Sequence, residues 1–257
     1  MALSDARSKL VRRLHRRKTR EREGLVLVEG PHAAAEAIAA GATVRFAVMS
    51  PRADQLDVAD VLTALGDAVE THHVQDRELA ELADTETPQG LLMVVEQPGI
   101  RWPPAADAGS EQVTGRWLVL DAVQDPGNVG TLVRAAAAFT CSGVVALDGT
   151  ADPWGTKAVR ASAGAVFRIP VHTGRRPGSE VTRALPSPLL AAEMGGDHPR
   201  QHAGDRWTLI IGNEGAGIRP ELLVAADASV AVPMPGGIES LNAAVAGAIL
   251  LYALGAP

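Results

Sequence analysis

Residues 117–139 read WLVLDAVQDPGNVGTLVRAAAAF, and they combine a strand, a turn and a helix in one stretch. The first seven residues are nearly all apolar and lack the alternation of a half-exposed strand, which predicts a strand buried on both faces. A turn at Asp125-Pro126-Gly127 follows, and we expect Asn128 to cap a helix of small and apolar residues. A buried strand that turns directly into a helix is typical of a parallel α/β sheet.

The same alternation extends through most of the chain in both directions. Glycine and proline mark the ends of the short apolar runs and of the segments with helical period. We expect strands at 24–30, 44–50, 90–97, 117–123, 143–148, 168–171, 207–212 and 228–235. We expect helices at 31–41, 60–68, 76–84, 128–139, 156–166, 219–226 and 236–254. Residues 70–75 fit a short strand or loop, and residues 174–206 are looser but hold at least one more helix or strand.

A stretch without hydrophobic periodicity separates two α/β parts of the chain. Residues 99–114 contain Pro103-Pro104, glycine and scattered polar residues, which indicates an interdomain linker. We therefore expect a small α/β domain at 24–98 and a larger one at 115–257. The fold class is α/β, with a mostly parallel sheet in the larger domain.

The charge is unevenly distributed. Residues 1–23 hold nine Lys/Arg and three acids, so this segment carries +6 and the rest carries −12, within a formal net charge of −6. A basic N-terminal arm on an acidic body is typical of phosphate-backbone binding, although a solvated terminal helix explains the charges equally well. No apolar run is long enough to span a bilayer and the N-terminus lacks a signal-peptide pattern, so we expect a cytoplasmic protein with no membrane partner.

Three junctions between a strand and a helix carry more polar residues than a structural turn needs. In the first, Arg134 is a charge in an otherwise small and apolar helix. The second, LIIGNEGAGIRPELL at 209–223, has glycines at 212, 215 and 217 that would let the backbone approach a ligand and leave its amides free. The third, GGIESLNAAVAGAILLYAL at 236–254, opens an apolar helix with the polar cluster Ser240-Leu241-Asn242.

Other candidates for chemistry are weaker. The glycine loops match neither the dinucleotide fingerprint nor the P-loop. His198 and His202 lie among proline and glycine, so we expect solvated side chains and no metal site. Ser162 lacks the leading glycine of a nucleophile elbow, and Cys141 fits a buried small hydrophobe.

The three junctions, in their order and spacing, resemble the motifs of the SpoU or TrmH-like branch of the SPOUT RNA methyltransferases. The stretches that carry the resemblance are NVGTLVRAAAAF, LIIGNEGAGI and VPMPGGIESLNAAVAGAILLY, with KAVRASAGAVFRIPV between the first two. The resemblance spans about 117–254 and is greatest for the rRNA type that includes thiostrepton-resistance enzymes. The stretch REREGLVLVEGPHAAAEAI is similar to the small L30e-like substrate-binding domain that many members carry.

The resemblance implies an enzyme that transfers a methyl group from S-adenosylmethionine to a ribose 2′-hydroxyl without a metal. It implies a deep trefoil knot in the larger domain, and homodimers with RNA as the partner. It implies catalytic roles for Arg134, Asn128, Glu214, Ser240 and Asn242. It implies cofactor contacts from Gly212, Val232 and Leu241, mainly through the backbone, and an adenine wall of Ile211 and Met234.

Several alternatives stay open from the sequence. A guanidinium with a pKa above about 12 is a poor general base, so we favour Arg134 as an electrostatic and phosphate-positioning group and leave the proton acceptor open. The substrate is expected to be 23S rRNA, with tRNA as the alternative and the modified nucleotide unassigned. An RNA-binding protein with a vestigial cofactor site is the hypothesis from another class. Whether residues 1–23 are ordered without RNA is open as well.

Overall fold

A computed structural model of the 257-residue chain describes residues 2–55, 59–66, 69–99, 113–174, 177–237 and 239–255. Its contacts divide the chain into two units, Met1–Gly99 with Trp154–Arg168, and Ile100–Pro153 with Ile169–Pro257. Most of the predicted linker, residues 100–112, lies outside the described residues. Within the described ranges, no helix has both the length and the hydropathy needed to cross a membrane.

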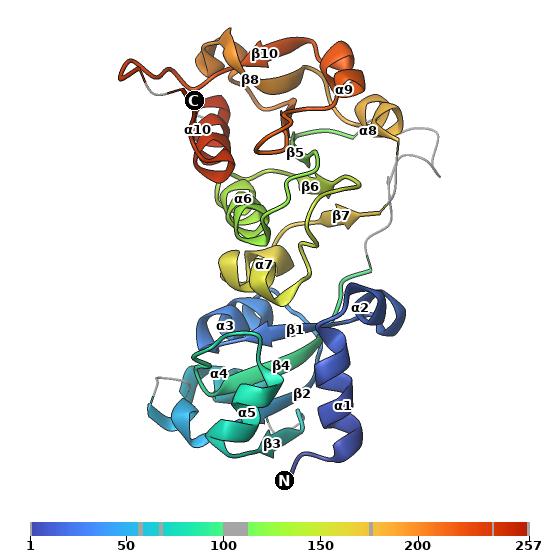
Figure 1. The fold of residues 1–257 in the computed structure, drawn as a ribbon, viewed down its shortest axis with the longest axis vertical. Helices are drawn as coiled ribbons and strands as arrows, with labels where there is room; N and C mark the ends of the chain where they lie inside the picture. The colour runs from blue at the N-terminus through green and yellow to red at the C-terminus, as the bar shows by residue number, and fades with distance from the viewer. Residues whose placement is uncertain are drawn as a thin grey trace. The chain divides into compact units, whose positions relative to one another are not determined.

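The first unit is built on a four-stranded mixed sheet in the order β1-β4-β2-β3 (Figure 1). Its strands are β1 Leu25–Glu29, β2 Val44–Met49, β3 Thr71–His73 and β4 Leu91–Glu96. Strand β4 runs antiparallel to both β1 and β2, whereas β2 and β3 are parallel. The helices that follow the strands are α3 Pro31–Ala39, α4 Ala59–Leu65 and α5 Asp76–Leu82, and η1 Pro51–Gln55 is a short 3-10 turn.

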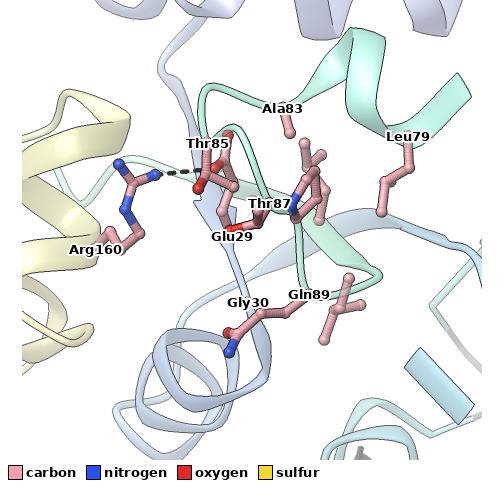
Figure 2. Close-up of a pocket in the computed structure, with 11 residues that line it drawn as sticks. Glu29, Gly30, Leu79, Ala83, Thr85, Thr87, Gln89 and Arg160 are labelled. Atoms are coloured by element: carbon pink, nitrogen blue, oxygen red, sulfur yellow. Dashed lines mark hydrogen bonds and ion pairs between the residues drawn. The ribbon is translucent and has the colours of Figure 1, made fainter. Parts of the chain in front are cut away.

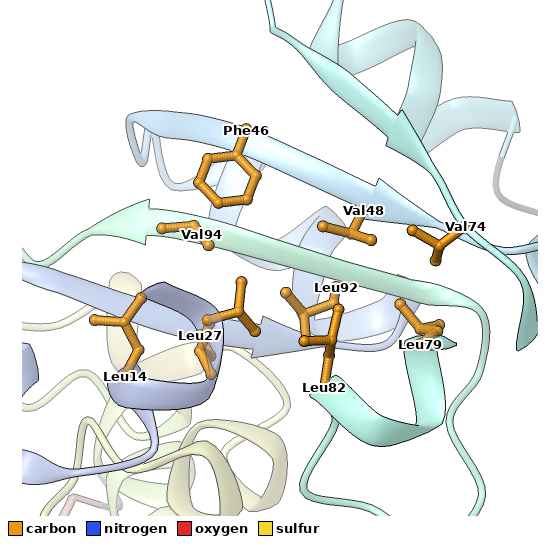
Figure 3. Packing of buried hydrophobic residues seen from close by; sticks show 10 residues of the cluster. Leu14, Leu27, Phe46, Val48, Val74, Leu79, Leu82, Leu92 and Val94 are labelled. Carbon is orange, nitrogen blue, oxygen red and sulfur yellow. The ribbon is translucent and has the colours of Figure 1, made fainter. Parts of the chain in front are cut away.

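The basic N-terminal segment forms two helices of this unit, α1 Asp5–Leu14 and α2 Arg17–Glu23. Val11 and Leu14 are fully buried in an apolar cluster with residues of β1, β2, β4 and α5, and Figure 3 shows Leu14 beside Leu27 in that cluster. Arg20 is buried too, and its guanidinium donates to the carbonyls of Leu14 and His15. The segment therefore packs on the sheet, and some of its basic side chains pair with acids of the same unit, as Arg7 does with Glu70.

The second unit contains a six-stranded sheet in the order β10-β8-β9-β5-β6-β7, and every pairing is parallel. This confirms the predicted mostly parallel sheet, while the trefoil knot stays a prediction. The strands are β5 Arg116–Leu120, β6 Gly143–Ala146, β7 Val171–Thr173, β8 Leu189–Asp197, β9 Trp207–Ile211 and β10 Ala228–Val230. The helices are α6 Pro126–Ala138, α8 Gly178–Ala184, α9 Pro220–Ala225 and α10 Ala243–Gly255, with the 3-10 turn η4 Pro199–His202.

Helices cover both faces of the parallel sheet, as the near-continuous apolar strands require. On one face, α8 and α9 pack on a cluster that includes Trp117, Val119 and Ile210. On the other face α6 and α10 lie side by side (Figure 1). Gly247 of α10 permits this approach, because a Cβ there would lie 2.3 Å from Leu132 Cδ2 and 3.5 Å from Ile211 Cδ1.

Several predicted boundaries are wrong, each for a local reason. The helix expected at 156–166 ends as α7 Thr156–Ala161, because Ala163 and Gly164 take left-handed φ values of +52° and +84°, and a short 3-10 turn, η3 Ala165–Phe167, follows. The strand expected at 168–171 is β7, shifted to Val171–Thr173. The strand expected at 228–235 stops at Val230, and the helix expected at 236–254 starts only at Ala243.

Candidate functional site

The motif residues gather at the carboxyl ends of the two central strands. Leu120 of β5 pairs with Ile211 of β9, so the segments that leave these strands begin side by side. The packing of α10 on α6 brings the start of α10 to the same edge. Ligands of open parallel sheets bind at this edge, beyond the carboxyl ends of the strands.

The α6 N-terminus differs from its prediction. The N-cap is Asp125, whose Oδ1 accepts from the Asn128 backbone N–H at 3.0 Å, and Pro126 takes the first helical position. Asn128 was therefore wrongly predicted as the cap. Asp125 takes the cap because the next residue, Pro126, is well suited to the first position of a helix. This leaves the Asn128 side chain available for other contacts, and it places Arg134 in the third turn of the helix.

The Asn128 side chain joins all three predicted motifs. Its Nδ2 donates to Glu214 Oε1 at 2.9 Å, and its Oδ1 accepts from Asn242 Nδ2 at 3.1 Å. Asn242 in turn caps α10, since its Oδ1 accepts from the backbone N–H groups of Ala244 and Val245 at 2.9 and 3.2 Å. Stretches more than 80 residues apart in sequence thus meet in one chain of hydrogen bonds.

Glu214 is held as a carboxylate. Burial raises its pKa, but hydrogen bonds from the Asn128 side chain and from backbone N–H groups outweigh burial, so the pKa of Glu214 lies below its ordinary value of 4.5. One of these donors is the backbone N–H of Gln124, 3.3 Å from Glu214 Oε2. The carboxylate therefore accepts from both ends of the β5–α6 turn.

The glycine-rich loop after β9 closes on itself. The backbones of Asn213 and Gly217 exchange two hydrogen bonds, and Asn213 Oδ1 accepts from the N–H groups of Gly215 and Ala216 at 2.9 and 2.8 Å. The expectation that the amides of this loop are free for a ligand is therefore wrong at Gly215 and Gly217, because the Asn213 side chain accepts from the first and the Asn213 backbone carbonyl accepts from the second. Gly212 is needed for the close approach: a Cβ there would lie 2.4 Å from the Gly217 carbonyl carbon.

Two further contacts hold this loop against β5, and neither was predicted from the sequence. Asn213 Nδ2 donates to the Ala122 carbonyl at 2.8 Å, at a residue whose φ is +56°. Asp121 is fully buried and accepts from Arg219 Nε at 2.6 Å and from the Arg219 backbone N–H at 2.8 Å. The charged Asp121, directly after a buried strand, was the available signal, since a buried carboxylate requires a partner.

Arg134 and Ser240 are not part of this network. Both are exposed, and within the described part of the chain neither side chain makes a hydrogen bond or an ion pair. Arg134 is thus a charge that no described side chain neutralises, on the helix that carries Asn128. Ser240 belongs to the stretch before α10 rather than to its first turn.

The residues predicted to contact a cofactor occupy two positions. Ile211 is buried at the end of β9 and Gly212 follows it, whereas Val232, Met234 and Leu241 lie in the irregular segment between β10 and α10. Among the described residues, the backbone groups of Val232, Met234 and Leu241 make no hydrogen bond. An apolar wall with unpaired backbone groups fits the requirements of a purine.

The remaining candidates lie apart from the site. Cys141 is buried, which confirms the prediction of a buried small hydrophobe, and burial raises the pKa of its thiol to about 12. His202 contacts Asp197 at 3.1 Å and His198 accepts from the Arg200 backbone. In the ranges that the structure covers, no group of three His, Cys, Asp or Glu side chains is arranged to hold a metal.

Comparison with known proteins matches both parts of the chain. The SpoU rRNA methylase family matches residues 115–252, and the MRM3-like substrate binding domain matches residues 6–93. The 23S rRNA (guanosine(2553)-2′-O)-methyltransferase RlmP of Bacillus subtilis is 32% identical over 255 residues, covering 95% of this chain and 93% of its own length.

Two solved structures share the fold over nearly the whole chain. The AdoMet-bound rRNA methyltransferase from Sinorhizobium meliloti has a TM-score of 0.78 at 28% identity, covering 99% of this chain and 95% of that one. The SpoU methyltransferase AviRb from Streptomyces viridochromogenes, in complex with AdoMet, has a TM-score of 0.80 at 28% identity, covering 98% and 97%. The resemblance that the three motifs predicted is confirmed, and the chain belongs to the SpoU rRNA methylase family.

Proposed function

We propose that this protein transfers a methyl group from S-adenosylmethionine to a ribose 2′-hydroxyl of large-subunit ribosomal RNA in the cytoplasm. The observation that carries the proposal is the hydrogen-bonded chain from Glu214 through Asn128 to Asn242, which unites the three motifs in a domain that matches the family. Its relative RlmP is named for the same chemistry on 23S rRNA.

The residues at the site fit the cofactor. When bound, S-adenosylmethionine supplies a methyl group that is attached to a positively charged sulfur. Because of this charge the sulfur is a good leaving group, and it needs no metal to activate it. Val232, Met234 and Leu241 have backbone groups that make no hydrogen bond with the described residues, and Ile211 is a buried apolar residue at the end of β9. The ring closed by Asn213 and Gly217 keeps the Gly212 backbone at the same edge.

The chain's own contribution to the reaction is positioning and electrostatics. An aligned donor and acceptor gain much of their rate from proximity, which a pre-formed network provides before RNA arrives. Glu214 and Asn242 fix the Asn128 amide from two sides, so its orientation is set. The exposed guanidinium of Arg134 is available to hold the phosphate and ribose of the substrate. The acceptor of the hydroxyl proton is not assigned to a side chain.

The protein is further proposed to act as a homodimer. Helix α10 presents Val245, Ile249 and Tyr252 at exposed fractions of 49%, 39% and 60%, and the spacing i, i+4, i+7 places them on one face. Such a stripe fits the same stripe on a second copy. Sedimentation should give a dimer that Val245→Asp converts to a monomer, and a wild-type monomer at high protein concentration would contradict the proposal.

The activity is tested with tritiated S-adenosylmethionine. Unmodified 23S rRNA should become labelled at a 2′-O position, which nuclease-resistant dinucleotides identify. Label on tRNA in place of rRNA would assign the alternative substrate. Failure to label either RNA, together with no heat of cofactor binding in calorimetry, would favour an RNA-binding protein with a vestigial cofactor site and contradict the proposal.

A further inference from the structure

A pocket lies in the first unit, and none of its lining residues belongs to the three motifs. Its volume is about 250 Å³, and its walls come from the end of β1, the start of α3, α5, the loop between α5 and β4, and α7 (Figure 2). Sites for drug-sized ligands usually measure about 300–1,000 Å³, so this pocket suits a smaller flat group.

The charged part of the pocket is a buried carboxylate. Glu29 is only 6% exposed, and its Oε1 accepts from the Asp84 backbone N–H at 2.6 Å. Its Oε2 accepts from Arg160 Nη1 at 3.1 Å, the contact dashed in Figure 2. A carboxylate has about four acceptor positions, so two remain for a further donor. Burial raises the pKa of Glu29, and Arg160 and the backbone donor oppose that rise.

The rest of the lining is divided by chemistry. Leu79 and Leu92 are buried and apolar, whereas Thr87 and Gln89 are exposed and polar. A flat ring with a polar edge matches this combination, because its faces meet apolar side chains while its edge reaches donors and acceptors.

Gly30, between β1 and α3, leaves space in the pocket because it has no side chain. It takes a φ of +87°, and a Cβ there would lie 2.7 Å from Gln89 Oε1. The absence of a side chain therefore lets the Gln89 amide reach across the end of β1, as Figure 2 shows for the two residues. Gly30 is also the N-cap of α3, so the positive end of that helix borders the pocket.

A role limited to an ion pair does not account for the hollow. If Glu29 and Arg160 served only to attach α7 to β1, close packing around the pair would be expected, as in protein interiors generally. The pair instead borders an open volume that a neighbouring loop lines with hydroxyl and amide groups. A buried charge beside an open, polar-edged volume is typical of a ligand site.

We propose that this pocket receives one unstacked base of the RNA substrate, with the exocyclic amino group of the base donating to the Glu29 carboxylate. The identity of the partner as RNA rests on the proposed function. Single-stranded RNA is commonly read through the edges of splayed bases, and carboxylates accept from the cytosine N4 amino group. The residues that hold the base are Glu29, Thr87, Gln89 and Arg160, with Leu79 and Leu92 beneath it.

The test compares two probes that differ at one edge. Fluorescent oligonucleotides C12 and U12 share backbone and ring size, but only cytosine carries the amino group. The full-length protein should bind C12 about fivefold more tightly than U12, since one such contact is worth about 1 kcal/mol or more. Equal affinity for the two, or binding of neither, would overturn the proposal.

Two variants locate the preference in the pocket. Thr87→Trp fills the mouth from an exposed position and should abolish the C12 preference, while Ala80→Trp, on the exposed face of α5, should preserve it. Glu29→Gln adds a donor that suits the uracil O4, so the preference should fall or reverse. A preference that survives both Thr87→Trp and Glu29→Gln would contradict the assignment. These binding measurements do not depend on methyl transfer. A protein that transfers no methyl group but keeps the C12 preference would therefore refute the proposed function and leave the base-binding pocket supported.

Discussion

The Asn128 side chain donates to Glu214 across 2.9 Å and thereby ties the first turn of α6 to the loop after β9. The Oδ1 atom of Asn128 accepts from Asn242, so the amide cannot rotate without breaking both contacts. Each partner comes from a different strand-to-helix junction. The stability of this edge and the geometry of the candidate site are therefore linked, and substitutions can separate them.

Glu214→Gln tests the carboxylate of this link. The wild-type protein should be more stable than the variant by about 0.5–1 kcal/mol at pH 7, because glutamine has one acceptor oxygen for two donors. The pKa of Glu214 is lowered in the folded protein, so its contribution is fully present above the ordinary value of 4.5 and is lost as the pH falls through the lowered pKa. Urea unfolding from pH 7 to pH 3 measures this difference. A gap between the two proteins that stays constant down to pH 3 would exclude the role of ionisation.

Asn242→Asp separates helix capping from the contact with Asn128. Aspartate is as good an N-cap as asparagine, so the capping contribution is kept and the unfolding free energy should fall only by the lost contact with Asn128, about 0.5–1 kcal/mol. Methyl transfer should fall at least about tenfold, because the donor to Asn128 Oδ1 is lost and the Asn128 amide is no longer held. Asn242→Ala loses the cap as well and should unfold about 1 kcal/mol more easily than Asn242→Asp. Tritium transfer and urea unfolding on the three proteins distinguish these effects.

Gly212→Ala and Gly215→Ala form a matched pair in one loop. A Cβ at 212 would lie 2.4 Å from backbone atoms of Gly217, whereas a Cβ at 215 would find its nearest neighbour at 3.6 Å. The first substitution must displace the loop, and we expect cofactor affinity to fall more than about tenfold. The second should leave affinity within about twofold. Calorimetry with S-adenosylmethionine checks both, and equal losses would indicate that the close approach at Gly212 is unimportant.

The sequence was sufficient for the elements with strong local patterns. The runs around β5 and β9 are apolar without alternation, so their burial in a parallel sheet could be predicted from hydropathy alone. Pro31 at the start of α3 and Gly41 after it marked that helix. The ordered motifs also led to the family, which no single glycine loop would have done.

The errors arose where a side chain far away in sequence decides the structure. Asn213 uses its side chain to close the glycine loop and to reach Ala122, and composition alone does not reveal that the loop amides are taken. The start of α10 was predicted too early, because the apolar period gives no weight to Asn242, which caps the helix while it contacts Asn128. The buried pair of Asp121 and Arg219 spans 98 residues, beyond any local pattern.

Arg134→Ala tests the exposed charge that no described residue neutralises. Since the side chain is exposed and makes no hydrogen bond or ion pair with the described residues, the substitution should leave the unfolding temperature and the cofactor affinity unchanged. Methyl transfer at saturating cofactor should fall about 10²–10³-fold, as expected when a charge that stabilises the transition state is removed.

Arg134→Lys distinguishes the possible roles of this residue. Lysine retains the charge but not the planar fork, so activity should lie between wild type and Arg134→Ala if the guanidinium holds phosphate and ribose in two-point contact. If Arg134 were instead the proton acceptor, lysine, with its lower pKa, would restore activity increasingly as the pH rises towards 10. An Arg134→Lys rate that stays a fixed fraction of wild type from pH 7 to pH 10 would therefore assign Arg134 to positioning and leave proton removal to another group.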